Sequence, residues 1–341
     1  NYHYQIIVKD VDGMADTTYF GAVVNGEIVE EDLPSGVEPG VNFMNDGTAV
    51  LAVFAPYKEF IHVIGNFNDW YVDENFLMKK YAPSPDSVVY WLRTDDIVPD
   101  QVYQYQYLID GELRIADPYA ELILDPWNDQ YINAETYPEL PDYPGNKTEH
   151  LVSAFEKRSE GFQWTDQDYI KPDKEKLVIY ELLIRDFTEE HTYTSTLEKL
   201  DYLDSLGVNV IELLPVNEFE GNSSWGYNPS MYFAVDKYYG TADDLKNFVN
   251  ECHRRGMAVV TDVVYNHAFG TNSMARMYLN DAWLPSAENP WFNTTAPHTD
   301  YSWGYDFDHE SKHTKYFLDR ANRFWVEEFH IDGFRFDFTR G

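Results

Sequence analysis

Two charged residues near the end of the chain stand two positions apart in a strand-like segment. Arg335 and Asp337 alternate with Phe334, Phe336 and Phe338, so we expect the charged pair on one side of the strand and the rings packed on the other. A guanidinium beside a carboxylate favours the ionised carboxylate and orients it. A carboxylate held in that state is what a glycosidase nucleophile needs to attack an anomeric carbon. A purely structural Arg–Asp pair in a barrel interior is the alternative.

Polar residues also follow three earlier apolar segments. These are Glu181 with Arg185-Asp186, then Glu212 with Asn217-Glu218 and Trp225-Gly226-Tyr227-Asn228-Pro229, and then Asp262 with Asn266-His267. In parallel α/β architectures, binding and catalytic groups collect at the carboxyl ends of the strands. Four such clusters in succession therefore predict a single site.

The elements that must position these residues lie after residue 176. Apolar runs at 177–180, 208–214, 258–264 and 333–338 are typical of strands, and the first reads as a strand buried on both faces. Helices are expected at 196–206, from the capping-box pair Thr241 and Asp244 to about residue 255, and through Phe317 to Glu328. Successive β–α steps imply parallel strands with right-handed crossovers. The pattern alone allows a doubly wound sheet or a (β/α)₈ barrel.

The preceding part of the chain has a different pattern. Residues 1–40 contain a strand-like start and a Pro/Gly-rich stretch, and we assign them no role. Residues 41–137 show short strands at 49–54, 60–64, 88–92 and 102–109, with Asp110-Gly111 as a hairpin turn, which predicts an immunoglobulin-like β-sandwich. Residues 138–175 are expected to be a linker, and 176–341 the region of parallel β–α units.

Composition limits the classes of partner. The 341 residues carry 25 Lys+Arg against 59 Asp+Glu, a net charge of −34, which argues against binding nucleic acid or anionic membrane surfaces. The single cysteine excludes an intrachain disulfide, and no apolar run approaches the roughly 18 residues of a membrane span. An aromatic content of 17% suits a protein that stacks on sugars, although core packing also uses these rings. The acidic composition and the absence of an initial Met favour a secreted or periplasmic protein, and the sequence indicates no oligomeric state.

Two of the motifs together resemble the α-amylase family, glycoside hydrolase family 13. Asp262-Val263-Val264-Tyr265-Asn266-His267 and Gly333-Phe334-Arg335-Phe336-Asp337 are similar to the family's first and second signature regions. Trp225-Gly226-Tyr227-Asn228-Pro229 resembles its motif after the second barrel strand, and Gly65-Asn66-Phe67-Asn68-Asp69-Trp70 resembles a turn of the sandwich domain that precedes branching and debranching enzymes. The resemblance implies an N-terminal β-sandwich followed by the first half of a (β/α)₈ barrel.

The resemblance also implies roles for the matching residues. Asp337 would be the nucleophile of a retaining double displacement, with Arg335 as its partner and Asp262 bracing Arg335 from the neighbouring strand. His267 would hydrogen-bond the sugar at the cleavage site and Tyr227 would stack on it. For these two, the alternatives are a structural histidine and a core tyrosine.

Two further positions correspond less well to the family. Arg340 stands where many members have Lys, so we expect a sugar contact there. No cofactor is required, but Asn266 matches a position that binds calcium in many amylases, with Asp300, Asp306 and Asp308 as further oxygen ligands. Gly341 stands where those amylases usually carry His, which argues against calcium.

The family's general acid is a Glu after the fifth barrel strand, and the 341 residues contain no matching motif. We therefore expect an incomplete site, inactive alone, from a longer retaining glycosidase that acts on α-glucans of the starch or glycogen type. An α-glucan branching enzyme or another glucanotransferase is the first alternative. A non-catalytic glucan-binding protein is the second.

Overall fold

The computed structural model describes residues 2–22, 26–298 and 302–339. The chain forms two compact units, the first comprising Asn1–Asp117 and Pro144–Lys157 and the second Pro118–Tyr143 and Arg158–Gly341. These boundaries differ from the predicted sandwich at 41–137 and linker at 138–175. The reason is that β11 (Val152–Glu156), inside the predicted linker, pairs with β8 (Val102–Ile109) of the first unit. No helix among the described residues has both the length and the apolar character needed to cross a bilayer.

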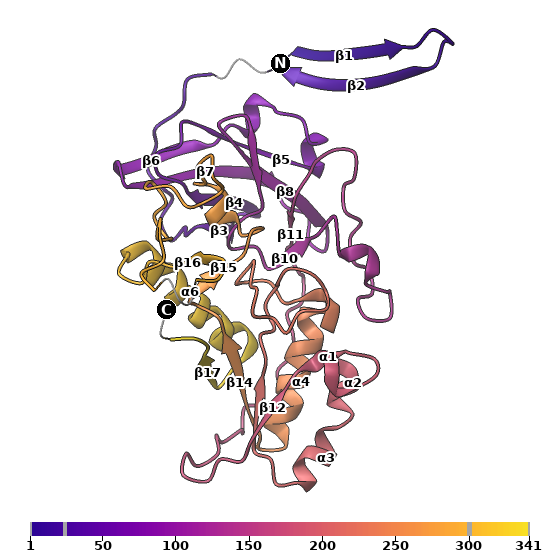
Figure 1. The fold of residues 1–341 in the computed structure, drawn as a ribbon, viewed down its shortest axis with the longest axis vertical. Coiled ribbons are helices and arrows are strands. Elements are labelled where there is room, and N and C mark those ends of the chain that lie inside the picture. Colours follow the sequence, from indigo (N-terminus) through magenta and orange to yellow (C-terminus); the bar gives the residue numbers. More distant parts are fainter. Residues whose placement is uncertain (1, 23–25, 299–301, 340–341) are drawn as a thin grey trace. The chain divides into compact units, whose positions relative to one another are not determined.

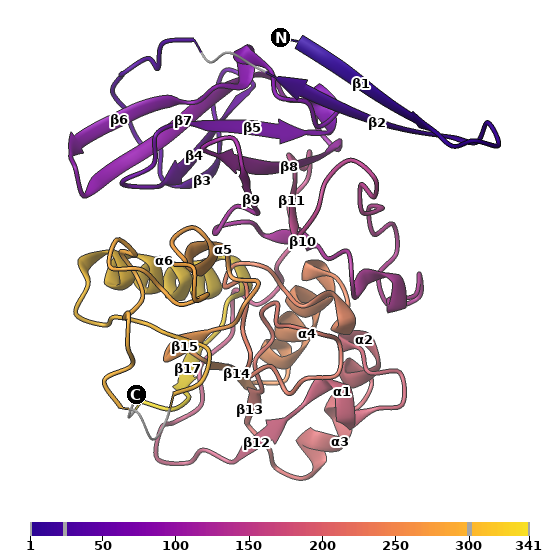
Figure 2. The same ribbon diagram turned by 45° about the horizontal axis from the view of Figure 1, so that its top comes forward.

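The first unit contains two antiparallel sheets and a separate hairpin. One sheet has the order β3 (Gly40–Phe43), β4 (Thr48–Phe54), β7 (Ser87–Asp96) and β6 (Lys79–Ser84). In the other, β5 (Ile61–Gly65) pairs with β8, which also pairs with β11 and β9 (Leu113–Ile115). The sheets share buried side chains such as Ala49 and Tyr103, and the hairpin is formed by β1 (Tyr2–Lys9) and β2 (Ala15–Ala22) (Figure 2). Short 3₁₀ turns lie at η1 (Asn66–Asn68) and η2 (Glu74–Phe76).

One histidine of this unit is buried without a polar partner. His62 of β5 is 1% exposed, and neither ring nitrogen has a hydrogen-bond partner. Burial lowers the pKa of His62, because the charged imidazolium would lose its hydration.

We expect His62 to make the first unit less stable in acid. A lowered folded-state pKa means that the unfolded chain binds the proton first, so the contribution is lost as pH falls below about 6.5. His62→Leu should therefore gain stability relative to the parent as pH falls, with a limiting slope of about 1.4 kcal/mol per pH unit. Urea unfolding at pH 7.5 and 5.5 measures this, with the exposed His309→Leu as control. An unchanged stability difference between parent and His62→Leu at the two pH values would contradict it.

The second unit is built on four parallel strands. Their order is β12 (Ile179–Leu182), β13 (Val210–Leu213), β14 (Ala258–Val263) and β17 (Gly333–Phe336), with successive strands paired in parallel (Figure 1; β13 is labelled in Figure 2). The predicted succession of parallel strands is confirmed. The predicted burial of 177–180 on both faces is wrong, because β12 is an edge strand and Leu177, Val178 and Ile179 are exposed. Phe336, expected to be packed, is exposed on the other edge strand for the same reason.

Helices pack against this sheet and complete one hydrophobic core. The core includes Leu203 of α3 (Leu200–Ser205), Phe248 of α4 (Ala242–Arg254) and Trp325 of α6 (Lys312–Phe329). The single cysteine, Cys252 of α4, is fully buried here. The helix predicted at 196–206 is instead two helices, α2 (Tyr193–Leu197) and α3, whereas the capping box at Thr241 is confirmed.

The remaining elements of the second unit are short and connect these helices and strands. They are η3 (Asp129–Tyr131), α1 (Ile184–Phe187), η4 (Lys237–Tyr239), β15 (His267–Ala268), α5 (Ser273–Arg276) and β16 (Tyr305–Asp306). The short strand β10 (Leu122–Leu124) belongs instead to the sheet with the order β10, β11, β8 and β5.

A buried lysine joins two segments of this unit. The side chain of Lys237, 2% exposed, pairs with Glu218 and lies 3.3 Å from Asp129 Oδ1. Asp236 is also buried, and burial raises the pKa of Glu218, Asp236 and Asp129, because a charged carboxylate would lose its hydration; the shared cation Lys237 opposes this rise. The network thus ties residues near 129 to the loop after β13.

Candidate active site

Three of the predicted charged residues meet at the carboxyl ends of β14 and β17. The strand register places Asp262 beside Arg335, and the backbone N–H of Asp337 donates to Val263 O at 3.0 Å. Arg335 Nη1 donates to Asp262 Oδ2 at 2.8 Å and also to Asp337 Oδ1. The guanidinium therefore holds two carboxylates at once, one buried and one partly open to solvent.

The hydroxyl of Tyr227 joins the same group. It donates to Asp262 Oδ2 at 2.7 Å, so this oxygen accepts both from Tyr227 and from Arg335. Burial raises the pKa of Asp262, while the two hydrogen bonds oppose that effect. Burial lowers the pKa of Arg335, but hydrogen bonds to Asp262 and Asp337 outweigh it and leave that pKa raised. Arg335 thus remains a fixed positive charge beside Asp337.

His267 lies next to Tyr227 with both ring nitrogens engaged. Its Nε2 is 3.0 Å from Tyr227 O, which can only accept, so Nε2 carries the proton. Its Nδ1 then accepts from Asn266 Nδ2 at 3.1 Å. Burial lowers the pKa of His267, in agreement with a neutral ring. The predicted hydrogen bond to a sugar would require exchange of the contact with Tyr227 O.

The predicted calcium position has a poor ligand set. The Asn266 side-chain amide is directed at His267, and Asp306 Oδ2 already accepts from Asn293 at 2.7 Å. A hard cation needs six or more oxygens, and within the described residues no cluster of three acidic or histidine side chains forms here. Asp300 and the predicted sugar-contacting Arg340 both lie outside the described residues. Among the residues that the structure describes, those near Asn266 therefore do not fit calcium.

Two aromatic residues that the sequence analysis did not select also belong to this region. Trp303 is 50% exposed, with its ring 6.5 Å from that of His267 and 4.8 Å from that of Phe338. Tyr232 OH donates to His267 O at 2.9 Å, and Trp325 Nε1 donates to Tyr232 O at 3.0 Å. Neither residue lies in a periodic pattern or a motif, and the overall aromatic content was the only signal.

The chain is similar in sequence to proteins of known family. The α-amylase catalytic-domain family matches residues 192–302. Malto-oligosyltrehalose trehalohydrolase from Saccharolobus solfataricus is 37% identical over 237 residues, covering 69% of this chain and 36% of that protein. A 1,4-alpha-glucan branching enzyme from Bacillus caldolyticus is 28% identical over 316 residues, covering 87% of this chain and 42% of that protein. The chain belongs to the α-amylase family.

The chain also shares its fold with solved structures of an alpha amylase and a pullulanase. A putative alpha amylase from Salmonella typhimurium superposes with a TM-score of 0.67 at 21% identity, over 87% of this chain and 43% of that one. The Group B Streptococcus pullulanase SAP, in complex with maltotetraose, gives 0.64 at 23% identity, over 88% and 42%. The fold is thus an N-terminal sheet domain followed by part of a (β/α)-barrel, and the chain spans about two fifths of these relatives' length.

A glycine in the family motif sets the position of Tyr227. Gly226 has a φ of +92°, and a Cβ there would lie 2.7 Å from Pro215 Cβ and 2.9 Å from Pro215 O. Gly221 has a φ of +74° with nothing within 4 Å of its would-be Cβ. The two glycines therefore share the left-handed backbone but differ in the contact with Pro215.

We expect Gly226→Ala to be much more harmful than Gly221→Ala. The control, Gly221→Ala, should lower the free energy of unfolding by about 1 kcal/mol through backbone strain. Gly226→Ala adds a steric clash with Pro215 and should lower it by about 2–4 kcal/mol. Because Tyr227 must shift, its hydrogen bond to Asp262 should also weaken. Urea denaturation of both variants measures the difference. Equal losses would mean that the loop relaxes away from Pro215.

Proposed function

We propose that this chain is part of a retaining glycosidase that cleaves α-glucans of the starch or glycogen type. The observation that carries the proposal is Asp337, hydrogen-bonded to Arg335 and partly open to solvent at the carboxyl end of β17. Membership of the α-amylase family and a relative named as a hydrolase at 37% identity support it. The barrel part would be the first half of a (β/α)₈ barrel, in keeping with four consecutive parallel strands.

In this proposal Asp337 acts as the nucleophile. Its carboxylate oxygen forms a bond to the anomeric carbon while the glycosidic C–O bond breaks, and the leaving oxygen takes a proton from a general acid. Water then attacks the same carbon and gives a proton to the deprotonated acid, and the Asp337 carboxylate is released. Two inversions at one carbon give retention of configuration.

Arg335 and Asp262 have supporting roles in this mechanism. Arg335 orients Asp337 through a charge-assisted hydrogen bond, and Asp262 holds Arg335 from the next strand. Asp262 is unsuitable as the general acid, because it is buried and already accepts from Tyr227 and Arg335. We propose that the acid is supplied from outside these 341 residues, so that the chain is inactive alone.

We also propose substrate contacts for the neighbouring side chains. Tyr227 would present its ring to the sugar at the cleavage site, and His267 would hydrogen-bond that sugar after giving up the Tyr227 carbonyl. Arg340 would add a further contact. The partner is an uncharged polysaccharide, which the net charge of −34 does not repel.

A glucanotransferase is the second candidate, because the branching enzyme matches 87% of the chain. Incubation of the complete protein with amylose and amylopectin separates the two. Hydrolysis creates new reducing ends, whereas branching creates new branch points without a net gain of reducing ends. If neither new reducing ends nor new branch points appear, the protein is a glucan-binding protein, and its retention on an amylopectin column tests this. Turnover by the 341-residue chain alone would show that the acid lies within it.

A further inference from the structure

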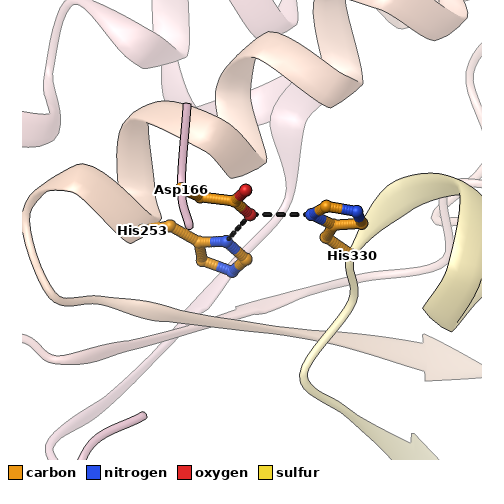
Figure 3. Close-up of side chains that lie close together, drawn as sticks. All are labelled: Asp166, His253 and His330. Atoms are coloured by element: carbon orange, nitrogen blue, oxygen red, sulfur yellow. Dashed lines mark hydrogen bonds and ion pairs between the residues drawn. The ribbon is translucent and has the colours of Figure 1, made fainter. Parts of the chain in front are cut away.

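Three side chains of the second unit converge at the opposite end of β17 from Asp337. Asp166 Oδ2 lies 2.8 Å from His253 Nδ1 and 2.7 Å from His330 Nδ1, so one carboxylate oxygen lies between two imidazoles (Figure 3). The three atoms all lie within 4.8 Å of one another. They come from the segment before β12, the last turn of α4 and the C-cap of α6. Asp337 follows β17, whereas His330 precedes it, so this cluster is separate from the candidate active site.

The geometry points to a binding site for a divalent first-row transition metal such as zinc, with Asp166, His253 and His330 as ligands. Two imidazole nitrogens and one carboxylate oxygen suit zinc and its neighbours, whereas calcium and magnesium prefer all-oxygen sets. A tetrahedral ion with bonds of about 2.0 Å separates its ligand atoms by about 3.3 Å, so the two Nδ1–Oδ2 distances must open by roughly half an ångström. Three protein ligands leave the fourth position to water.

A second layer of contacts orients the ligands as metal sites require. His253 Nε2 is 2.9 Å from Asp332 Oδ2, so a carboxylate holds the ring nitrogen that would not bind the ion. Asp332 itself accepts from the backbone N–H of Val259 at 2.8 Å and lies 3.2 Å from Lys171 Nζ. A carboxylate that fixes the far side of a metal-binding imidazole is the usual arrangement in zinc sites.

Aromatic rings stack on the imidazoles of His253 and His330 and fix their planes. Of the three proposed ligands, His330 is the one partly exposed to solvent. Tyr169 stacks on His253 with ring centroids 4.0 Å apart, and Trp164 stacks on His330 at 3.7 Å. The side chains of His253 and Asp166 are 2% and 8% exposed, whereas that of His330 is 34% exposed. An ion would therefore enter past His330, and once bound it would tie together three segments that are distant in sequence.

Calorimetric titration of the 341-residue chain with zinc sulfate tests the site, after removal of any tag and dialysis against chelator. We expect one ion per chain and a Tm rise of about 5 °C at a zinc concentration a hundred times Kd. Cobalt(II) as a second probe should give the strong visible absorption of a tetrahedral complex. Asp332→Asn, which leaves all three ligands in place, should weaken zinc binding 10- to 100-fold.

Variants separate this site from binding elsewhere. The main variant is His330→Gln, because the partly exposed side chain of His330 tolerates the change. Circular dichroism checks that this variant folds. The second variant is His253→Gln. The exposed His298→Gln is the control. Binding lost in His330→Gln and kept in the control supports the site. If the parent chain binds no zinc, or if parent and His330→Gln bind it equally, the proposed metal site is wrong. The three side chains would then form only a structural hydrogen-bonded cluster. None of these outcomes depends on activity toward glucans.

Discussion

Asp337→Asn in the complete protein is expected to reduce turnover of amylopectin roughly 10⁴- to 10⁶-fold. The amide has nearly the same size as the carboxylate but cannot form the covalent bond to the anomeric carbon. Arg335 keeps its hydrogen bond to Asp262 in this variant, so the strand ends should keep their arrangement. Affinity for a malto-oligosaccharide should therefore change by no more than a few-fold. Initial rates of reducing-end release and calorimetric binding measure the two effects.

The control for this variant is Asp173→Asn, which removes an exposed carboxylate that forms an ion pair with Lys176 and accepts from the backbone N–H of Glu175. It should retain full turnover. If Asp337→Asn kept more than about 1% of the parent rate, another carboxylate would be the nucleophile. If it lost binding together with turnover, Asp337 would serve mainly to hold the site together.

Lys237→Met is expected to destabilise the second unit by about 3–5 kcal/mol. The substitution leaves the buried Glu218 and Asp236 and the partly buried Asp129 without their shared cation, and an uncompensated buried charge has a cost of this size. Lys246→Met is the matched control, because its partner Glu328 is half exposed and can be hydrated again. The control should lose no more than about 1 kcal/mol. Guanidinium chloride unfolding measures both.

The pH dependence of this loss has a definite sign. Burial raises the folded-state pKa of Glu218 and Asp236, so the folded chain binds protons more tightly than the unfolded chain. Their contribution is present in acid and is lost as pH rises through the raised pKa values of the two groups. Without Lys237 the repulsion grows, so the variant should lose more stability at pH 8 than at pH 5. If Lys237→Met lost equal stability at pH 5 and pH 8, water would be entering the site around Glu218 and Asp236 and hydrating their carboxylates.

Much of the fold was predictable because local patterns and tertiary structure agree. The strand at 102–109 and the capping box at Thr241 are observed where their patterns placed them. Edge position was not predictable, because the apolar run at 177–180 has the composition of a buried strand whether or not a neighbour covers it. The linker predicted at 138–175 contains β11, and this strand could not be predicted, because its pairing with β8 depends on contacts distant in sequence.

The candidate site was predictable to the extent that it lies on strands. Alternation places Arg335 and Asp337 on one side of β17, and the contact between Asp262 and Arg335 follows from parallel register. Tyr227 and His267 were found through motifs, but the hydrogen bond between them could not be read from either. Trp303 and Tyr232 lie in segments without periodicity, where sequence gives no direction for a side chain. The roles of all these residues remain predictions.

The buried thiol of Cys252 is a chemical probe for the rate at which the second unit opens. Burial raises its pKa well above the ordinary value, so almost no reactive thiolate exists while α4 is packed against β14. An alkylating reagent can therefore modify the chain only during the moments when that helix separates from the sheet. The rate of labelling then reports how often the core beneath the active-site strands opens. Because no other cysteine exists, mass spectrometry reads that rate from a single added group.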